Sequence, residues 1–197
     1  MARGIRVYIQ RVIPMLKFIG NCQGVIDWNA VIKDIETQHA AYIGPRHDVG
    51  HNVPGVEEVA RPIREAGYKL KHEGGNASWD MYLPGTNFDV SIVERFVDWV
   101  GMDGYTNAWI SRVKPGDVAP WHWDITDHEE TLEREGLHPD RYHCHVSMPA
   151  DGHVLIVEDQ CLYNQAQGNV YKWPSRKSWH AGANAGLVPK YLFNIWR

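Results

Sequence analysis

The stretch "NAWISRVKPGDVAPWHWD", from Asn107 to Asp124, contains the pattern that decides the fold. Strand-forming residues at each end predict two β-strands, and the Lys-Pro-Gly-Asp sequence between them is typical of a tight turn. In the second strand His122 and Asp124 stand two residues apart. A regular strand directs residues i and i+2 to the same face, so the two side chains are expected to converge on one point.

Strand-like segments continue to the C-terminus, separated by turn residues. The six further segments are Arg141–Met148, His153–Asp159, Gln160–Asn164, Asn169–Trp173, Ser178–Ala183 and Lys190–Trp196. A series of short strands at this spacing is typical of a closed or sandwiched all-β unit. We therefore predict a mainly β fold with flanking helices.

The first half of the chain carries helical patterns. Apolar residues recur at helical spacing in Val25–Tyr42 and in Val90–Val100, with loop rich in Gly, Pro and Asn between them. A short charged helix is predicted at 127–135. We expect a single domain, residues 1–197, in which residues 1–104 form a helical and loop region that braces a β core at 105–197.

Composition excludes several classes of function. The 197 residues are 44% hydrophobic, which indicates a globular chain, and the net charge of −4 with no basic run argues against nucleic acid or an anionic membrane as partner. No stretch approaches the roughly 20 apolar residues of a membrane helix. The apolar N-terminus is broken by Pro14 and Lys17, so we read it as mature sequence. Three scattered cysteines indicate reduced thiols in a cytoplasmic protein.

A third candidate ligand follows later in the chain. His180, in "SWHAGA", joins His122 and Asp124 to give the two-histidine, one-carboxylate set of non-haem Fe(II) sites. The alternative is that His122 packs on tryptophans while Asp124 caps a turn. Neither His138 nor the loop His47–His51 is expected to bind metal, because one precedes a proline and the other is rich in glycine, with no element to align the ligands.

A polar row is predicted on one face of the strand "RYHCHVS". It consists of Arg141, His143, His145 and Ser147. Burying such a row is costly unless an anion or a metal pairs with it, and the alternative is a face open to solvent. Lys190, on the last strand, has two readings as well. It either protects a sheet edge or faces the same interior.

From Asn107 to the C-terminus the chain resembles the Fe(II)/2-oxoglutarate-dependent oxygenases, and among them the aspartyl/asparaginyl β-hydroxylase type. The Pro115–Gly116 turn stands six residues before His122, as in that family, and Ser111 matches a serine that contacts 2-oxoglutarate. His180 matches the distal metal ligand. Ten residues later Lys190 stands where the family has an arginine for the far carboxylate of 2-oxoglutarate.

The segment "RYHCH" is similar to the family's Arg-x-Arg-x-His strand. His145 matches the histidine near the co-substrate, whereas His143 stands in place of the second arginine, which is a departure from the family. The resemblance implies a double-stranded β-helix, a cupin-like jelly roll, that binds Fe(II) through His122, Asp124 and His180. It also implies 2-oxoglutarate as co-substrate, bound through the four residues Ser111, His143, His145 and Lys190.

The implied reaction is hydroxylation of a C–H bond in a peptide, an amino acid or a small polar metabolite, with 2-oxoglutarate converted to succinate and CO2. Trp121 and Trp123 are expected to point away from the metal face and to hold the strand rigid. Two alternatives stay open. One is a cupin-like metal enzyme that does not use 2-oxoglutarate, and the other is a jelly-roll module that binds carbohydrate or peptide.

Overall fold

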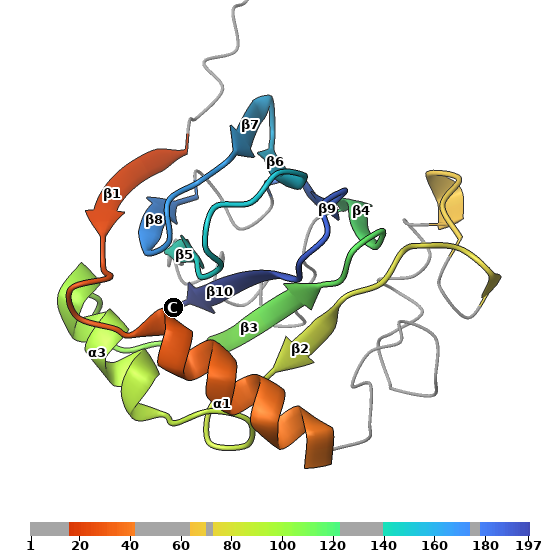
Figure 1. Ribbon diagram of the computed structural model, residues 1–197. Coiled ribbons are helices and arrows are strands. Elements are labelled where there is room, and N and C mark those ends of the chain that lie inside the picture. The colour runs from red at the N-terminus through yellow and green to blue at the C-terminus, as the bar shows by residue number, and fades with distance from the viewer. Residues whose placement is uncertain (1–15, 42–63, 70–72, 123–139, 174–177) are drawn as a thin grey trace, which may run out of the picture.

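Two antiparallel β-sheets face each other in the computed structural model, which describes residues 16–41, 64–69, 73–122, 140–173 and 178–197 (Figure 1). The larger sheet has the order β1-β8-β5-β10-β3-β2 and the smaller one β4-β9-β6-β7. The strands are β1 (Lys17–Asn21), β2 (Asp80–Tyr82), β3 (Asn107–Val113), β4 (Val118–His122), β5 (Arg141–His145), β6 (His153–Val157), β7 (Gln160–Tyr163), β8 (Asn169–Lys172), β9 (His180–Asn184) and β10 (Lys190–Trp196).

The eight strands predicted after Gly104 are all present, as β3 to β10, and the mainly β, jelly-roll class is confirmed. Two more strands come from the N-terminal half, where the sequence predicted only helices and loops. β1 pairs with β8 and β2 pairs with β3, so both lie at the edges of the larger sheet. β2 has three residues and β1 changes register between Phe18 and Gly20, so neither shows a clear strand pattern in sequence.

Two helices cover the outer face of the larger sheet (Figure 1). α1 (Trp28–Ala41) is capped at its N-terminus by Asp27. The carboxylate of Asp27 accepts hydrogen bonds from the N–H groups of Asn29 and Ala30, both at 3.1 Å. α3 (Ser91–Val100) packs Phe96 edge-on against Phe193 of β10, with ring centroids 4.9 Å apart. Both helices confirm the predicted patterns. The charged segment 127–135 lies outside the described residues.

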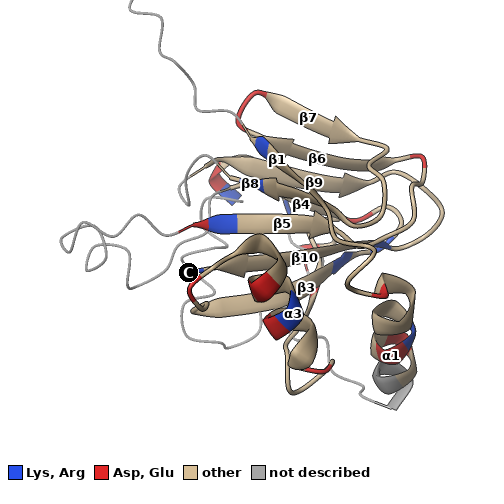
Figure 2. Cartoon of the chain, turned by 90° about the vertical axis from the view of Figure 1, so that its left-hand side faces the viewer, with Lys and Arg blue, Asp and Glu red and all other residues tan. Residues whose placement is uncertain are grey.

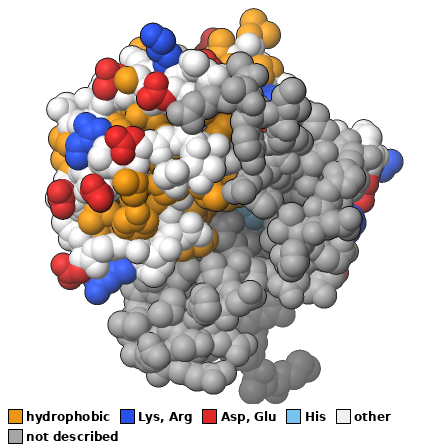
Figure 3. All heavy atoms as spheres, turned by 90° about the horizontal axis from the view of Figure 1, so that it is seen from below, with side chains coloured by type: hydrophobic (Ala, Val, Ile, Leu, Met, Phe, Trp, Pro, Cys, Tyr) orange, Lys and Arg blue, Asp and Glu red, His pale blue; other side chains and the backbone are white. Residues whose placement is uncertain are grey.

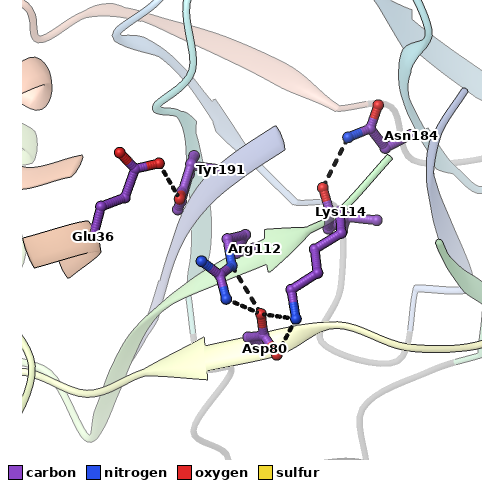
Figure 4. A network of polar contacts seen from close by, with 7 residues as sticks. Glu36, Asp80, Arg112, Lys114, Asn184 and Tyr191 are labelled. Atoms are coloured by element: carbon purple, nitrogen blue, oxygen red, sulfur yellow. Dashed lines mark hydrogen bonds and ion pairs between the residues drawn. The ribbon is translucent and has the colours of Figure 1, made fainter. Parts of the chain in front are cut away.

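A buried ion pair secures the outer face of β3 (Figure 4). Arg112 donates a hydrogen bond of 2.8 Å from Nε to the carboxylate of Asp80 on β2, and Lys114 lies 3.2 Å from the same carboxylate. Close by, the hydroxyl of Tyr191 on β10 donates to Glu36 of α1 at 2.9 Å. These contacts fasten the edge strand β2 and the helix α1 to the centre of the larger sheet.

The face of β5 that carries the polar row points between the sheets. Arg141, His143, His145 and Ser147 are all buried, so the alternative of a solvated face is wrong. Lys190 is 1% exposed and lies on β10, between β5 and β3 in the middle of the larger sheet, so it does not protect an edge. Figure 2 shows most of the charged residues in loops, helices and strand ends, which sets this interior cluster apart.

Candidate metal and co-substrate site

His122 and His180 lie side by side on neighbouring strands of the smaller sheet. They are direct partners in the register of β4 and β9, and their ring centroids are 4.2 Å apart. Both side chains are buried. The structure therefore brings together two of the three metal ligands that the sequence predicted, from segments more than fifty residues apart.

Hydrogen bonds to backbone carbonyl groups fix the tautomer of both rings. Nδ1 of His180 lies 3.1 Å from the carbonyl oxygen of Ser178, and Nδ1 of His122 contacts the carbonyl oxygen of Pro120. A carbonyl oxygen only accepts hydrogen bonds, so each Nδ1 carries the proton. The lone pair of each ring then resides on Nε2, which is how neutral histidine ligands are prepared for a metal.

The turn before β4 sets the position of His122. Asp117 donates its N–H to the carbonyl of Lys114 at 3.0 Å, with Pro115 and Gly116 at the central positions. The φ of Gly116 is +82°, which a type II turn requires and which favours glycine. Gly116 also donates to the carbonyl of Asn184 at 2.8 Å, so the turn is fastened to β9, the strand of the second histidine.

The strand β4 is irregular before the histidine. Its register with β9 shifts between Ala119 and His122, around Pro120, which has no N–H to donate. Irregularities of this kind change the direction in which a nearby side chain points, and His122 is the residue at which the regular pairing resumes. Trp121 stacks on Trp179 with centroids 6.2 Å apart, away from the histidine pair, as the sequence predicted for it.

The remaining predicted ligand, Asp124, lies outside the described residues, as do Trp123, His138 and the His47–His51 loop. Over the ranges that the structure describes, no three His, Cys, Asp or Glu side chains gather into a metal-binding group. The donor set in view is thus the His122–His180 pair. Its two Nε2 lone pairs fit a divalent transition metal that keeps room for a carboxylate and for exchangeable ligands.

A pocket between the sheets is lined by three further histidines and a lysine. It is lined by His143, His145, His153, Leu155, Leu162, Gln165, Lys190 and Leu192. The ammonium of Lys190 donates to the carbonyl of Val154, and burial lowers the pKa of Lys190 to about 7. Among the described residues no carboxylate pairs with this lysine.

Gly182 connects the histidine pair to the pocket. It follows His180 by two residues on β9 and so faces the same interior. A Cβ atom on Gly182 would lie 3.6 Å from Nζ of Lys190. The ammonium of Lys190 therefore lies beside the β9 position that is two residues from His180. Two residues correspond to about 7 Å along a strand.

His143 and His145 flank this pocket from β5. Nδ1 of His143 accepts a hydrogen bond of 2.6 Å from Nε1 of Trp173, and the Trp173 ring lies edge-on to His180 with centroids 4.7 Å apart. Burial, then the charge of Arg141, holds the pKa of His143 well below its usual value. Burial and the charge of Lys190 lower the pKa of His145 to about 3. Both rings are neutral at pH 7.

Ser111, the remaining residue that the resemblance assigns to 2-oxoglutarate, lies on β3. It shares the inward face with Lys190 but is not among the residues that line the pocket. Its Oγ accepts hydrogen bonds from Nε1 of Trp109 at 3.0 Å and from Nδ2 of Asn194 at 3.3 Å. Arg141 lies over the ring of Trp173, with Cζ 3.7 Å from the centroid.

The sequence did not predict three residues of this site. Trp79 stacks on His122 with centroids 5.6 Å apart, Trp173 bridges His143 and His180, and His153 lines the pocket from β6. Trp79 comes from a segment that reads as loop, so no local pattern singles it out. His153 opens the predicted strand "HVLIVED", where its inward direction could have been inferred from alternation with Leu155 and Val157.

Comparisons with known proteins support the fold. No family model matches the chain, and no curated protein matches it in sequence. Among solved structures, a truncated form of the viral collagen prolyl hydroxylase from Paramecium Bursaria Chlorella virus-1 covers 92% of this chain and 87% of its own, with 13% identity and a TM-score of 0.50.

Two further solved structures are similar at lower TM-scores. The same viral hydroxylase in complex with 2OG covers 71% of this chain and 89% of its own, with 14% identity and a TM-score of 0.40. An oxidoreductase of the 2OG-Fe(II) oxygenase family from Burkholderia pseudomallei covers 74% and 57%, with 14% identity and a TM-score of 0.36. At these identities the likeness concerns the fold alone.

Proposed function

We propose that the chain is an Fe(II)- and 2-oxoglutarate-dependent dioxygenase that hydroxylates a C–H bond. One observation carries the proposal. Lys190 is buried and has no carboxylate partner among the described residues. Its ammonium lies against Gly182, two residues along β9 from His180, and His180 pairs with His122 on β4. A metal-chelating dicarboxylate satisfies both features at once, because one end binds the metal and the other meets the ammonium.

In this proposal His122 and His180 bind Fe(II) through Nε2, and Asp124 is the third ligand. When bound, the iron activates dioxygen for oxidative decarboxylation of 2-oxoglutarate and hydroxylation of the substrate. The hydrogen bonds from Nδ1 to the carbonyls of Pro120 and Ser178 hold both rings in the ligand orientation. Trp79, stacked on His122, restricts one side of the pair.

Lys190 binds the far carboxylate of 2-oxoglutarate. A carboxylate beside a buried ammonium favours the charged form and offsets the burial that lowers the lysine pKa. The resulting charge-assisted hydrogen bond lacks the bidentate geometry of an arginine. His145 and His143 line the same pocket as neutral rings, and Ser111, whose Oγ already accepts two hydrogen bonds, is proposed to donate its own proton to the co-substrate.

The proposed substrate is a peptide, an amino acid or a small polar metabolite, without nucleic acid or membrane as partner. The net charge of −4 supports this, and the described face in Figure 3 shows acidic and basic side chains interspersed among hydrophobic ones. None of the helices within the described ranges is long and apolar enough to cross a membrane. A cytoplasmic location is proposed from Cys22, Cys144 and Cys161, which are free thiols.

Within the superfamily we propose the aspartyl/asparaginyl β-hydroxylase type. The support is the Pro115–Gly116 turn, which leads into β4 and stands six residues before His122, and the burial of His145. Two residues of this chain depart from the type: Lys190 and His143 each stand where the type has arginine.

Metal content and 2-oxoglutarate turnover test the proposal together. We expect purified protein to bind one equivalent of Fe(II) and to convert 2-oxoglutarate to succinate, while His122→Ala and His180→Ala lose stoichiometric iron. Ala183→Val, on the outward face of β9, is the control for strand integrity and should retain iron. If both histidine variants keep a full equivalent, the ligand assignment is wrong. If iron-loaded protein never turns over 2-oxoglutarate, the cupin-like alternative replaces the proposal.

A further inference from the structure

His153 is a buried histidine that the proposed reaction does not yet use. It lies at the start of β6 in the smaller sheet and is 2% exposed. Its ring faces that of His145, on the opposite sheet, with centroids 6.2 Å apart. Nε2 of His153 lies 3.0 Å from the carbonyl oxygen of Val188, so Nε2 carries a proton and donates it.

Two buried ring nitrogens of this pair have no hydrogen-bond partner among the described residues. They are Nδ1 of His153 and Nε2 of His145. Both residues line the pocket that also contains Lys190. Buried polar atoms nearly always have a hydrogen-bond partner, because a buried donor or acceptor without one destabilises the folded state. Two such atoms lie beside an ammonium that has no carboxylate partner among the described residues, which indicates that a ligand supplies the missing partners.

We propose that His153 is a ligand-binding residue, and that with His145 and Lys190 it forms a three-residue site for one carboxylate that takes up a proton as the carboxylate binds. The inference rests on the proposed function for the identity of the ligand, the far carboxylate of 2-oxoglutarate. The three residues come from β6, β5 and β10, so both sheets contribute to the site.

The chemistry of the neutral ring explains the proton. With its Nε2–H donated to Val188, neutral His153 presents a lone pair at Nδ1, which repels a carboxylate. Protonation turns Nδ1 into a donor and adds a charge of the right sign. Among the described residues, the titratable groups near the pocket are His143 and His145 on β5, Lys190 on β10 and Cys161 on β7, and none of them is a carboxylate that could take the place of the ligand.

The electrostatics of the pocket agree with this geometry. Burial, and then the charge of Lys190, lower the pKa of His153, while its hydrogen bond to Val188 opposes them. A carboxylate bound among the three groups opposes the effect of the lysine charge on the pKa of His153, because a negative charge favours the protonated form of each neighbouring group. The apolar walls, Leu155, Leu162 and Leu192, keep water from screening these charges.

Calorimetric titration of the Mn(II)-loaded protein with 2-oxoglutarate tests the inference. We expect wild-type protein to bind more tightly at pH 6.5 than at pH 8.0, by about fivefold, and to take up protons, which is measured by comparing buffers of different ionisation enthalpy. His153→Gln keeps a donor for the Val188 carbonyl but does not titrate. It should weaken binding about tenfold at pH 6.5, or about 1.4 kcal/mol, and should take up fewer protons than wild type. Lys190→Met removes the other group that titrates in this pH range and should keep the proton uptake that His153 provides.

His143→Gln is the comparison for proton uptake alone: His143 lines the same pocket, so its loss can change the affinity, but its Nδ1 is already occupied by the hydrogen bond from Trp173. It should retain the proton uptake. If His153→Gln binds with unchanged affinity and unchanged pH dependence, His153 does not contact the carboxylate and the inference is wrong.

Glutarate, which has no keto group, and inorganic phosphate separate this inference from the proposed function. If the wild-type protein binds glutarate with proton uptake but never decarboxylates 2-oxoglutarate, the carboxylate site is supported and the oxygenase proposal is wrong. A wild-type protein that binds neither dicarboxylate, or that binds only phosphate, contradicts the carboxylate site.

Discussion

Lys190 reaches across the barrel to Gly182: a methyl group on the glycine would lie 3.6 Å from the ammonium nitrogen. One residue belongs to the larger sheet and the other to the smaller. The pair therefore fixes how far a buried charge lies from His180, which precedes Gly182 by two residues on β9. This spacing between a charge and a ligand pair is the central relationship of the proposed site.

The first prediction concerns the space beside Gly182. A Cβ there would make ordinary contacts of 3.6 Å with Lys190 and 3.8 Å with Ala119, so Gly182→Ala should fold normally. Gly182→Val adds two methyl groups beyond the alanine Cβ, and these enter the space between the ammonium and the histidine pair. We expect the valine variant to raise the 2-oxoglutarate requirement about tenfold or more, with the melting temperature as a check on folding. An unchanged requirement would show that the co-substrate does not pass this position.

The second prediction concerns the hydrogen bond from Trp173 to His143. Trp173→Phe removes the indole donor and leaves a buried imidazole nitrogen unsatisfied, which should lower the free energy of unfolding by about 1–3 kcal/mol. Trp99→Phe, at a half-buried position on α3, is the comparison for loss of ring area. Urea unfolding of both variants gives the difference, and equal losses would mean that the hydrogen bond contributes nothing beyond packing.

The third prediction concerns the ion pair that fastens β2. Asp80→Asn leaves the cation of Arg112 without its carboxylate in a site where both side chains are about a tenth exposed. We expect a loss of about 3 kcal/mol in unfolding free energy. Lys114→Ala removes the partner that is 43% exposed and should cost under about 1 kcal/mol. Similar losses for the two variants would refute the distinction.

Most of the fold could be predicted from sequence, because alternation and turn residues report strands locally. The eight strands after Gly104 and both helices follow from such patterns. The strands β1 and β2 do not, because a short edge strand is stabilised by its neighbour in the sheet rather than by its own pattern. The irregularity at Pro120 also escapes a pattern that assumes a regular strand.

The candidate site was predicted unevenly. The adjacency of His122 and His180 agrees with the resemblance, which implies that both bind one metal. The burial of Lys190 agrees with the reading in which it faces the interior, because strand alternation predicts the direction of a side chain. Trp79 and Trp173 contact the histidines through tertiary packing, which spacing along the chain does not encode. His153 was overlooked because its role emerges only when β6 lies opposite β5.

The fourth prediction concerns pH and the stability of the metal-free protein. The unfolded chain protonates His145 near pH 6.5, whereas the pKa of the buried ring is about 3. The unfolded state thus binds more protons than the folded state between these two pH values. The contribution of His145 to the free energy of unfolding is therefore complete above pH 6.5 and falls as the pH drops. From pH 7 to pH 5 we expect a loss of about 2 kcal/mol from this residue. Denaturant unfolding of His145→Gln should show a correspondingly flatter pH profile, and an equal slope in both proteins would contradict this assignment.

The most direct test is succinate formation by iron-loaded protein as a function of 2-oxoglutarate concentration, with Lys190→Met compared at equal iron content. Losing one partner of a buried charge pair costs about 2–5 kcal/mol, so the variant should need at least about tenfold more 2-oxoglutarate while it still binds iron through His122 and His180. Succinate release with that shift is the predicted result. Succinate release whose 2-oxoglutarate dependence is the same in Lys190→Met and wild type would contradict the assignment of the lysine, and no 2-oxoglutarate turnover at all by the iron-loaded wild type would contradict the account as a whole.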